Sequence, residues 1–131
     1  MYFVEKGKGS SLFRKYNLSF PQYNILRVLD ASTDGQSRIT EVSRIMLVSG
    51  ANMTGLAKRL EKSGFIARKS DPKDERVTLL EITPKGKTLL ADIEMKRDAL
   101  LEQMLKGFLA KEKKDLMILV RRILRNARQL G

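Results

Sequence analysis

The sequence has 131 residues, 42% of them hydrophobic, which is enough for one folded domain with a substantial core. It contains 26 Lys or Arg against 15 Asp or Glu, a net charge of +11, and it has neither cysteine nor histidine. These absences exclude disulfides, thiol redox sensing, Cys/His zinc sites and acid–base catalysis by imidazole.

The positive charge points to a polyanionic partner, and by itself leaves DNA, RNA and an anionic membrane surface open. No apolar run reaches transmembrane length, and residues 1–8 carry charges where a signal peptide needs an apolar segment. Paired catalytic carboxylates, a glycine-rich phosphate loop and a GxSxG turn are also missing. We therefore expect a cytoplasmic protein that is not an enzyme, needs no cofactor or metal, and does not contact membranes.

Residues 1–18 mix apolar and basic side chains and predict a short N-terminal helix. Ser19 is a plausible N-cap for a second helix, with Pro21 in its first turn. Asp34 and Gly35 would end the second helix. Its apolar positions are Ile25, Leu26, Val28 and Leu29.

Residues 37–63 show the spacing of two helices joined by a tight turn. Ser37–Met46 predicts a short amphipathic helix, and Leu47–Val48 forms a brief link. Ser49 can cap a third helix that runs to about Ser63, and Gly64 follows where a left-handed residue is favoured. Two helices connected in this way form the helix-turn-helix pattern.

After Gly64 the apolar period changes from 3.6 to 2. Phe65–Lys69 and Val77–Ile82 predict two short strands, and the polar segment Ser70–Arg76 predicts an exposed loop between them. A hairpin that directly follows the second helix of a helix-turn-helix is a wing.

Two long helices are expected after the hairpin. Thr83 would cap the first and Pro84 would open it, with apolar positions at Leu89, Leu90, Ile93, Leu100, Met104 and Phe108. The second, from about Ala110, carries an apolar stripe that we predict to be a dimer interface: Leu116, Leu119, Val120, Ile123, Leu124, Ala127 and Leu130. An intramolecular helical hairpin stays open as the alternative to a homodimer.

The run from Ser49 to Leu90 resembles the MarR family of bacterial regulators. It reads SGANMTGLAKRLEKSGFIARK and then DPKDERVTLLEITPKGKTLL, and LSFPQYNILRVL at 18–29 is similar to the family's second helix. The resemblance implies a mainly α fold with a small β-hairpin wing (α+β), a winged helix-turn-helix with terminal dimerisation helices. Residues 1–18 and 84–131 would form the dimerisation region and 19–83 the DNA-binding lobe of a single compact domain.

The resemblance also implies the function of a sequence-specific transcriptional regulator, such as a repressor. It would be a homodimer on pseudo-palindromic double-stranded DNA, modulated by a small aromatic or phenolic ligand. Tyr16, Phe20 and Tyr23 could line a ligand pocket, although burial of such residues in a core is the commoner case. A non-specific architectural nucleic-acid-binding protein and a protein-interaction winged helix remain alternatives.

The sequence departs from the family pattern in four respects. The segment before LFRKYNLSFPQ is short, so the dimer is expected to depend more on residues 116–130. Gly55 stands where a large polar residue is frequent, and Lys58 stands where an acid usually pairs with the residue matching Arg68. We therefore expect Lys58 and Arg68 to form a like-charged pair. The missing cysteine excludes the thiol chemistry of peroxide-sensing members.

The candidate DNA-binding residues fall on the third helix and the hairpin. A helix N-terminus in the major groove presents its first two turns to the bases, where Asn52 could contact adenine and Thr54 a thymine methyl or a phosphate. By resemblance, Arg76 enters the minor groove and Asp74 orients it. The full set is Ser49, Ala51, Asn52, Thr54, Gly55, Lys58, Lys62, Arg68, Lys69, Lys73, Asp74 and Arg76.

Overall fold

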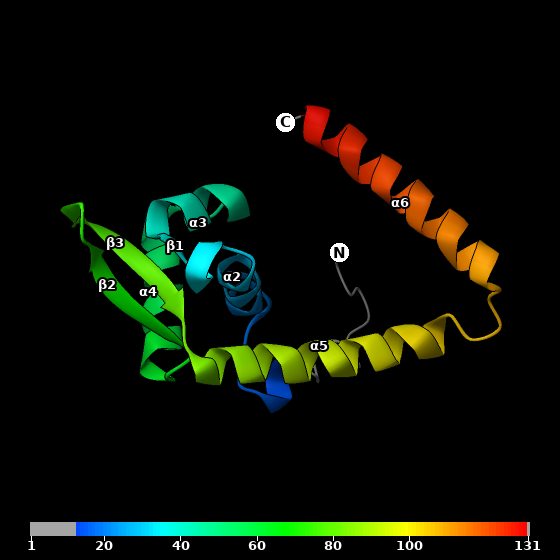
Figure 1. The fold of residues 1–131 in the computed structure, drawn as a ribbon, viewed down its shortest axis with the longest axis horizontal. Coiled ribbons are helices and arrows are strands. Elements are labelled where there is room, and N and C mark those ends of the chain that lie inside the picture. The colour runs from blue at the N-terminus through cyan, green and yellow to red at the C-terminus, as the bar shows by residue number, and fades with distance from the viewer. Residues whose placement is uncertain (1–12, 131) are drawn as a thin grey trace. The chain divides into compact units, whose positions relative to one another are not determined.

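The computed structural model describes residues 13–130, which fall into two compact units divided between Glu94 and Met95 (Figure 1). None of the helices in this range is long and apolar enough to cross a membrane. In chain order the elements are α2 (Phe20–Asp30), η1 (Thr33–Gly35), β1 (Gln36–Arg38), α3 (Ile39–Met46), α4 (Gly50–Lys62), β2 (Ile66–Asp71), β3 (Asp74–Ile82), α5 (Pro84–Met104) and α6 (Ala110–Leu130).

Helix α2 begins where its capping signals place it. The Ser19 side chain accepts a hydrogen bond from the Gln22 backbone N–H at 3.3 Å. The Gln22 side chain in turn accepts one from the Ser19 N–H at 3.0 Å, which completes a capping box. Of the predicted N-terminal helix, residues 13–15 are helical and residues 1–12 lie outside the described part of the chain.

The predicted helix Ser37–Met46 begins two residues late, because its first residues belong to a strand. β1 (Gln36–Arg38) pairs antiparallel with β3, with Ser37 opposite Leu80 and Arg38 opposite Leu79. The hairpin is therefore part of a three-stranded sheet in the order β1-β3-β2. This third strand ties the start of the helix-turn-helix to the base of the wing.

The wing is longer and more regular than the sequence predicts (Figure 1). β2 extends to Asp71 and β3 begins at Asp74, so the turn is reduced to Pro72 and Lys73 and the expected loop Ser70–Arg76 is wrong in extent. The register pairs Ile66 with Ile82, and it shifts at the Ser70–Asp71 step. A short turn on two paired strands holds its side chains in defined directions, which a loop of seven residues would not.

One apolar core holds the first unit together. Its fully buried side chains come from α2, α3, α4, β2, β3 and α5, and they include Ile25, Leu29, Val42, Met53, Leu60, Leu80 and Ile93. Tyr23 is buried in it and forms aromatic contacts with Phe13 and Phe20. Tyr16 is half-buried and its hydroxyl donates to the Asp92 carboxylate. The three aromatic candidates for a ligand pocket are thus packing residues.

The first three turns of α5 belong to this core, because Leu89, Leu90 and Ile93 are buried in it. The helix ends at Met104, so Phe108 lies outside it and the expected apolar position at 108 is not helical. Gly107 adopts φ +88° just before Phe108, a left-handed backbone that interrupts the helical path.

Helix α6 buries none of its side chains within the described chain. Along the predicted stripe, Leu116, Leu119, Ile123, Leu124 and Leu130 are between 43% and 90% exposed. An amphipathic helix in water gains its stability chiefly by covering its apolar face. The stripe therefore requires a partner that the described residues do not supply.

Three helices of the first unit end with the same backbone motif. At the end of α4, the Phe65 N–H donates to the Leu60 carbonyl and the Gly64 N–H to the Glu61 carbonyl, with Gly64 at φ +83°. This is a Schellman motif, which requires a left-handed residue. Asn17 occupies that position in the first helical turn and Leu47 occupies it after α3. Leu47 is the exception, since a left-handed backbone costs leucine about 1–2 kcal/mol.

Leu47→Gly should therefore raise the free energy of unfolding by about 0.5–1 kcal/mol, after allowance for the greater freedom of glycine in the unfolded chain. Little packing is lost, because Leu47 is 92% exposed. Urea denaturation measures the change. Leu47→Ala is the matched control, since it keeps the strained Cβ and should leave stability nearly unchanged. Equal stabilities for the two variants would contradict a strained turn.

Candidate nucleic-acid interface

The N-terminal turns of α4 present small and polar side chains to solvent. The Ser49 hydroxyl accepts from the Asn52 N–H at 3.3 Å and so caps the helix as predicted. Ala51 and Asn52 are exposed, which leaves the Asn52 amide available for a partner. The Thr54 hydroxyl donates to the Gly50 carbonyl at 2.9 Å, so its hydrogen is already used and cannot be donated to another partner.

The second and third turns of α4 combine open space with positive charge. A Cβ added at Gly55 would meet no other atom within 4 Å, so the space in front of this residue is open. Lys58 and Lys62 are exposed. The helix thus offers a face that another backbone could approach closely, followed by cations that suit phosphates.

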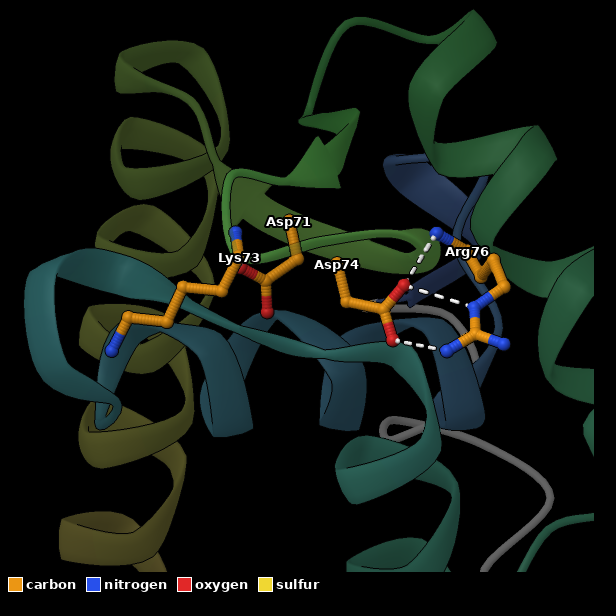
Figure 2. A network of polar contacts seen from close by, with 4 residues as sticks. All are labelled: Asp71, Lys73, Asp74 and Arg76. Atoms are coloured by element: carbon orange, nitrogen blue, oxygen red, sulfur yellow. Dashed lines mark hydrogen bonds and ion pairs between the residues drawn. The ribbon is translucent and has the colours of Figure 1, made fainter.

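The wing turn positions a single arginine with a carboxylate (Figure 2). Asp74 Oδ1 accepts from the Arg76 backbone N–H and from its Nε, both at 3.1 Å, and Oδ2 accepts from Nη2 at 3.2 Å. The side chain of Arg76 is nevertheless 89% exposed. The Arg76 hydrogen bonds hold the pKa of Asp74 below its usual value, so this carboxyl is ionised at neutral pH. The ion pair predicted between these two residues is present.

A second carboxylate, that of Asp71, also forms a hydrogen bond with the wing turn. Asp71 accepts from the Lys73 N–H at 2.9 Å, and its other oxygen lies 3.3 Å from Arg38 Nε. The Asp71 side chain is only 9% exposed, so Arg38 compensates the cost of burying its charge. Arg38 lies on β1, which makes it a link between the helix-turn-helix and the wing. Arg38 is not among the site residues predicted from the sequence, because Ser37–Met46 was expected to be helical and not to begin with a strand.

The other basic residues of the wing have different surroundings. Lys73 is exposed at the turn, and Lys69 Nζ lies 3.3 Å from Glu81 Oε1. Arg68 Nε lies 3.9 Å from Glu61 Oε1, a distance too long for a hydrogen bond. Two Arg68 nitrogens, Nε and Nη1, are buried without a hydrogen-bond partner among the described residues. Lys73 is thus the most available of the three candidates for phosphate contact.

The like-charged pair expected between Lys58 and Arg68 is not the dominant contact. Glu61, one turn further along α4 than Lys58, supplies the carboxylate that faces Arg68. The acidic residue that faces Arg68 thus stands three positions later on α4 than the family pattern implies, which is close to one helical turn and so on the same face of the helix. The contact between wing and recognition helix is therefore attractive.

The C-terminal end of α4 is fastened to the start of α5 by hydrogen bonds. The Thr83 N–H donates to the Phe65 carbonyl at 3.0 Å, and the Thr83 hydroxyl donates to the Gly64 carbonyl at 2.6 Å. Lys85 Nζ donates to the Ser63 carbonyl at 2.9 Å. Three successive carbonyls at the end of α4 are thus satisfied by two side chains and one backbone group of the α5 N-terminus, and we call this contact the α4–α5 clamp.

Gly86 allows the clamp to close. A Cβ at this position would lie 2.2 Å from the Phe65 carbonyl oxygen and 2.9 Å from the Ile82 side chain. The Gly86 N–H also donates to the Thr83 hydroxyl at 3.1 Å, which caps α5. Glycine is therefore required at 86 by close packing of backbone against backbone.

A model of the family described as transcriptional regulator SarA/Rot matches residues 9–93, which include the helix-turn-helix, the wing and the clamp. The chain belongs to the SarA/Rot family of transcriptional regulators. YxaD, an HTH-type transcriptional regulator of Bacillus subtilis, is 38% identical over 100 residues, which cover 76% of this SarA/Rot family member and 68% of YxaD.

Solved structures agree with this assignment at the level of the fold. AbsC, a MarR family transcriptional regulator of Streptomyces coelicolor, is 19% identical with a TM-score of 0.75, and the match covers 92% of this chain and 80% of AbsC. BpsR of Bordetella bronchiseptica is 21% identical with a TM-score of 0.66, covering 86% and 87% of the two chains, and its DNA binding is regulated by 6-hydroxynicotinic acid. The resemblance to the MarR family and the winged helix-turn-helix fold are thereby confirmed. This SarA/Rot regulator is a DNA-binding protein.

Substitution of Gly86 tests the clamp. Gly86→Ala should lower the free energy of unfolding by about 2 kcal/mol or more, because the added methyl overlaps backbone that is held on both sides. Gly55→Ala is the matched control, since open space at 55 should let alanine stabilise α4 by about 0.5–1 kcal/mol. Thermal unfolding of both variants measures the difference. A wild-type melting temperature for Gly86→Ala would contradict the packing described.

Proposed function

We propose that this regulator binds a pseudo-palindromic operator as a homodimer, with α4 in the major groove and the wing in the adjacent minor groove of each half-site. One observation carries the proposal: the Arg76 side chain is 89% exposed, yet its guanidinium is held by two hydrogen bonds to Asp74. An exposed arginine normally samples many rotamers and loses about 2 kcal/mol of entropy when it is fixed. A side chain fixed in advance avoids part of that cost on binding.

The α4 residues divide into base contacts and phosphate contacts. Asn52 is the residue that could discriminate a base, through a bidentate contact with adenine worth about 1–3 kcal/mol. Thr54, with its hydroxyl hydrogen engaged, offers its methyl group to a thymine methyl. Ala51 and Gly55 permit close approach of the helix backbone. The remaining contacts are to phosphates, which position the lobe without reading sequence. They come from Ser49, Lys58 and Lys62 at α4 and from Lys69 and Lys73 on the wing.

Arg68 has a supporting role in this proposal. Its side chain is 26% exposed and faces Glu61, so its charge is partly compensated inside the lobe. It would hold the wing against α4 and add to the positive potential at the DNA surface. Arg76 would insert into a narrow A/T-rich minor groove, where the negative potential is enhanced.

The homodimer follows from the exposed apolar stripe of α6. Leu116, Leu119 and Ile123 repeat at intervals of three and four residues, the spacing that packs one helix against another, and Leu124 adjoins Ile123. A second copy of the chain is the partner of choice, since C2 dimers are the commonest assembly and two lobes match the two half-sites of a palindrome.

A small aromatic or phenolic effector and a repressor role complete the proposal. BpsR shares the fold and its DNA binding is regulated by an aromatic acid, which supports ligand control in this chain as well. Tyr16, Phe20 and Tyr23 are engaged in packing, so a ligand would have to rearrange them to use them as a pocket. A non-specific architectural protein is the alternative, and it predicts equal affinity for operator and scrambled duplexes.

Arg76→Ala should weaken operator binding by about tenfold or more, with little change in melting temperature, because the lost contacts are at the surface. Fluorescence anisotropy with the preferred duplex, selected from a random pool, and with its scrambled version measures affinity and specificity together. Arg27→Ala is the control: Arg27 is also an exposed ion-paired arginine, 3.6 Å from Glu94, but it lies on α2 outside the proposed interface. Unchanged affinity for Arg76→Ala would remove the wing arginine from the site.

Ile123→Asp should convert the dimer to a monomer, because a charge buried in an apolar interface is costly. Ile118→Asp is the matched control: it lies five residues away on the same helix, about 140° around its axis, and is 46% exposed. Analytical ultracentrifugation measures the oligomeric state, with Val120→Asp as a second stripe variant. A dimer in all three variants would show that α6 is not the interface.

A further inference from the structure

More than half of the net positive charge belongs to the second unit, outside α4 and the wing. Residues 95–131 contain ten Lys or Arg and four Asp or Glu, a net charge of +6, whereas residues 1–94 hold the other +5. The second unit is thus more basic than the first although it is less than half as long. Contacts of α4 and the wing with an operator leave this charge unexplained.

Half of the Lys and Arg residues of the second unit lie along one line of α6. Lys111, Lys114, Ile118, Arg121, Arg125 and Arg128 follow one another at intervals of three or four residues, which places them on one face of a helix. All six are exposed. Of the two acidic residues of α6, Glu112 falls outside this spacing, whereas Asp115 follows Lys111 by four residues, lies beside the line and offsets part of its charge. We call these six residues the basic line. It extends over 17 residues, or about 25 Å.

The basic line and the apolar stripe lie on different faces of the helix. Ile118 and Ile123 differ by about 140° around the axis, so a partner that covers the stripe leaves the basic line accessible. Ile118, Arg121, Arg125 and Arg128 also line an open surface hollow, together with Leu124, the stripe residue at the border between the two faces. Basic side chains around a hollow focus positive potential toward whatever enters it.

We propose that the basic line of α6 is a second duplex-binding surface, which contacts the phosphate backbone of a DNA segment other than the one held by α4 and the wing. Arginine forms bidentate hydrogen bonds with phosphate, and three arginines follow one another on the line. Such contacts release counterions and need no particular base sequence. A regulator with both surfaces would bridge two segments of DNA.

Duplex DNA is favoured over an anionic membrane by the arrangement of the helix. A helix on a membrane surface inserts its apolar face into lipid. On α6 that face is the stripe, which lies about 140° from the basic line, so lipid would compete with the subunit partner for it. Phosphates of a second duplex can reach the basic line while the stripe stays covered. The proposal uses the established DNA binding of the family and does not depend on operator specificity.

Capture of a second duplex tests the proposal. Operator duplex is immobilised, saturated with protein, and washed to remove unbound protein, and a labelled duplex of random sequence is then added at 0.1 M salt. Wild-type protein should retain the labelled duplex. The double variant Arg121→Gln/Arg125→Gln should weaken this capture by about 60-fold, from two lost phosphate contacts at a slope of about 0.9 each. Its affinity for a single operator duplex should change by less than about twofold.

The matched control removes two exposed charges from the same unit outside the line. Lys106→Gln/Lys113→Gln should capture the second duplex as the wild type does, and sedimentation should show the same oligomer for both variants. Equal loss of capture in both variants would show that capture depends on the total charge of the unit and not on the basic line, and would overturn the proposal. So would wild-type capture by Arg121→Gln/Arg125→Gln, or a matching loss of single-operator affinity, which would place the line on the same duplex. Binding to vesicles of anionic lipid without duplex capture would assign the line to membranes instead.

Discussion

The close approach of two backbones at Gly86 is the constraint on which the DNA-binding lobe depends. A residue with a Cβ would meet the Phe65 carbonyl at 2.2 Å, so the start of α5 can pack here because position 86 is bare. The same approach brings Thr83 and Lys85 to the last carbonyls of α4. A recognition helix is useful only if its direction is fixed, and the α4–α5 clamp fixes it at the end remote from the exposed turns. Any displacement of the first turns of α5 must therefore be transmitted to α4, which gives the lobe a direct mechanical connection to the helix that leads into the second unit.

The wing shows how two carboxylates can serve a positively charged surface. Asp71, nearly buried, accepts a turn N–H and faces Arg38, while Asp74 fixes the exposed Arg76. Each acid reduces the net charge that a phosphate would encounter, so neither favours DNA binding by simple attraction. Their contribution is geometric, because they replace the rotational freedom of long side chains with one arrangement before DNA arrives. In the proposed interface, most of the long-range attraction would come from lysines such as Lys58, Lys62 and Lys73, whose exact positions would matter less.

The parts of the fold that local chemistry specifies were predictable from the sequence, and the parts that depend on distant partners were not. Ser19, Ser49 and Gly64 mark helix ends through short-range hydrogen bonds, so the start of α2 and both ends of α4 were placed correctly. The predicted end of α2 at Asp34 and Gly35 was wrong, because α2 ends at Asp30 and residues 33–35 form the separate turn η1. β1 has three residues and no periodicity of its own, and it exists because β3 offers a free edge. The Arg38–Asp71 pair was missed for the same reason, since it joins two strands that are far apart in sequence. The Arg68–Glu61 pair joins consecutive elements, but no helical or strand period relates residues across the turn at Gly64. The Asp74–Arg76 pair spans two residues within one turn, and the motif was sufficient to anticipate it.

Helix α6 buries no side chain of its own within the described chain, although its stripe leaves large apolar residues in water. Helices without a covered face are marginal in isolation, so the order of α6 is linked to whatever occupies the stripe. If that occupant is another copy of the regulator, then folding of the terminal unit obeys mass action and its free energy varies with the logarithm of protein concentration. The abundance of the protein in the cell would then set the fraction of chains that are fully folded. Synthesis rate and proteolysis become regulatory inputs, since partly folded copies are degraded before they can assemble.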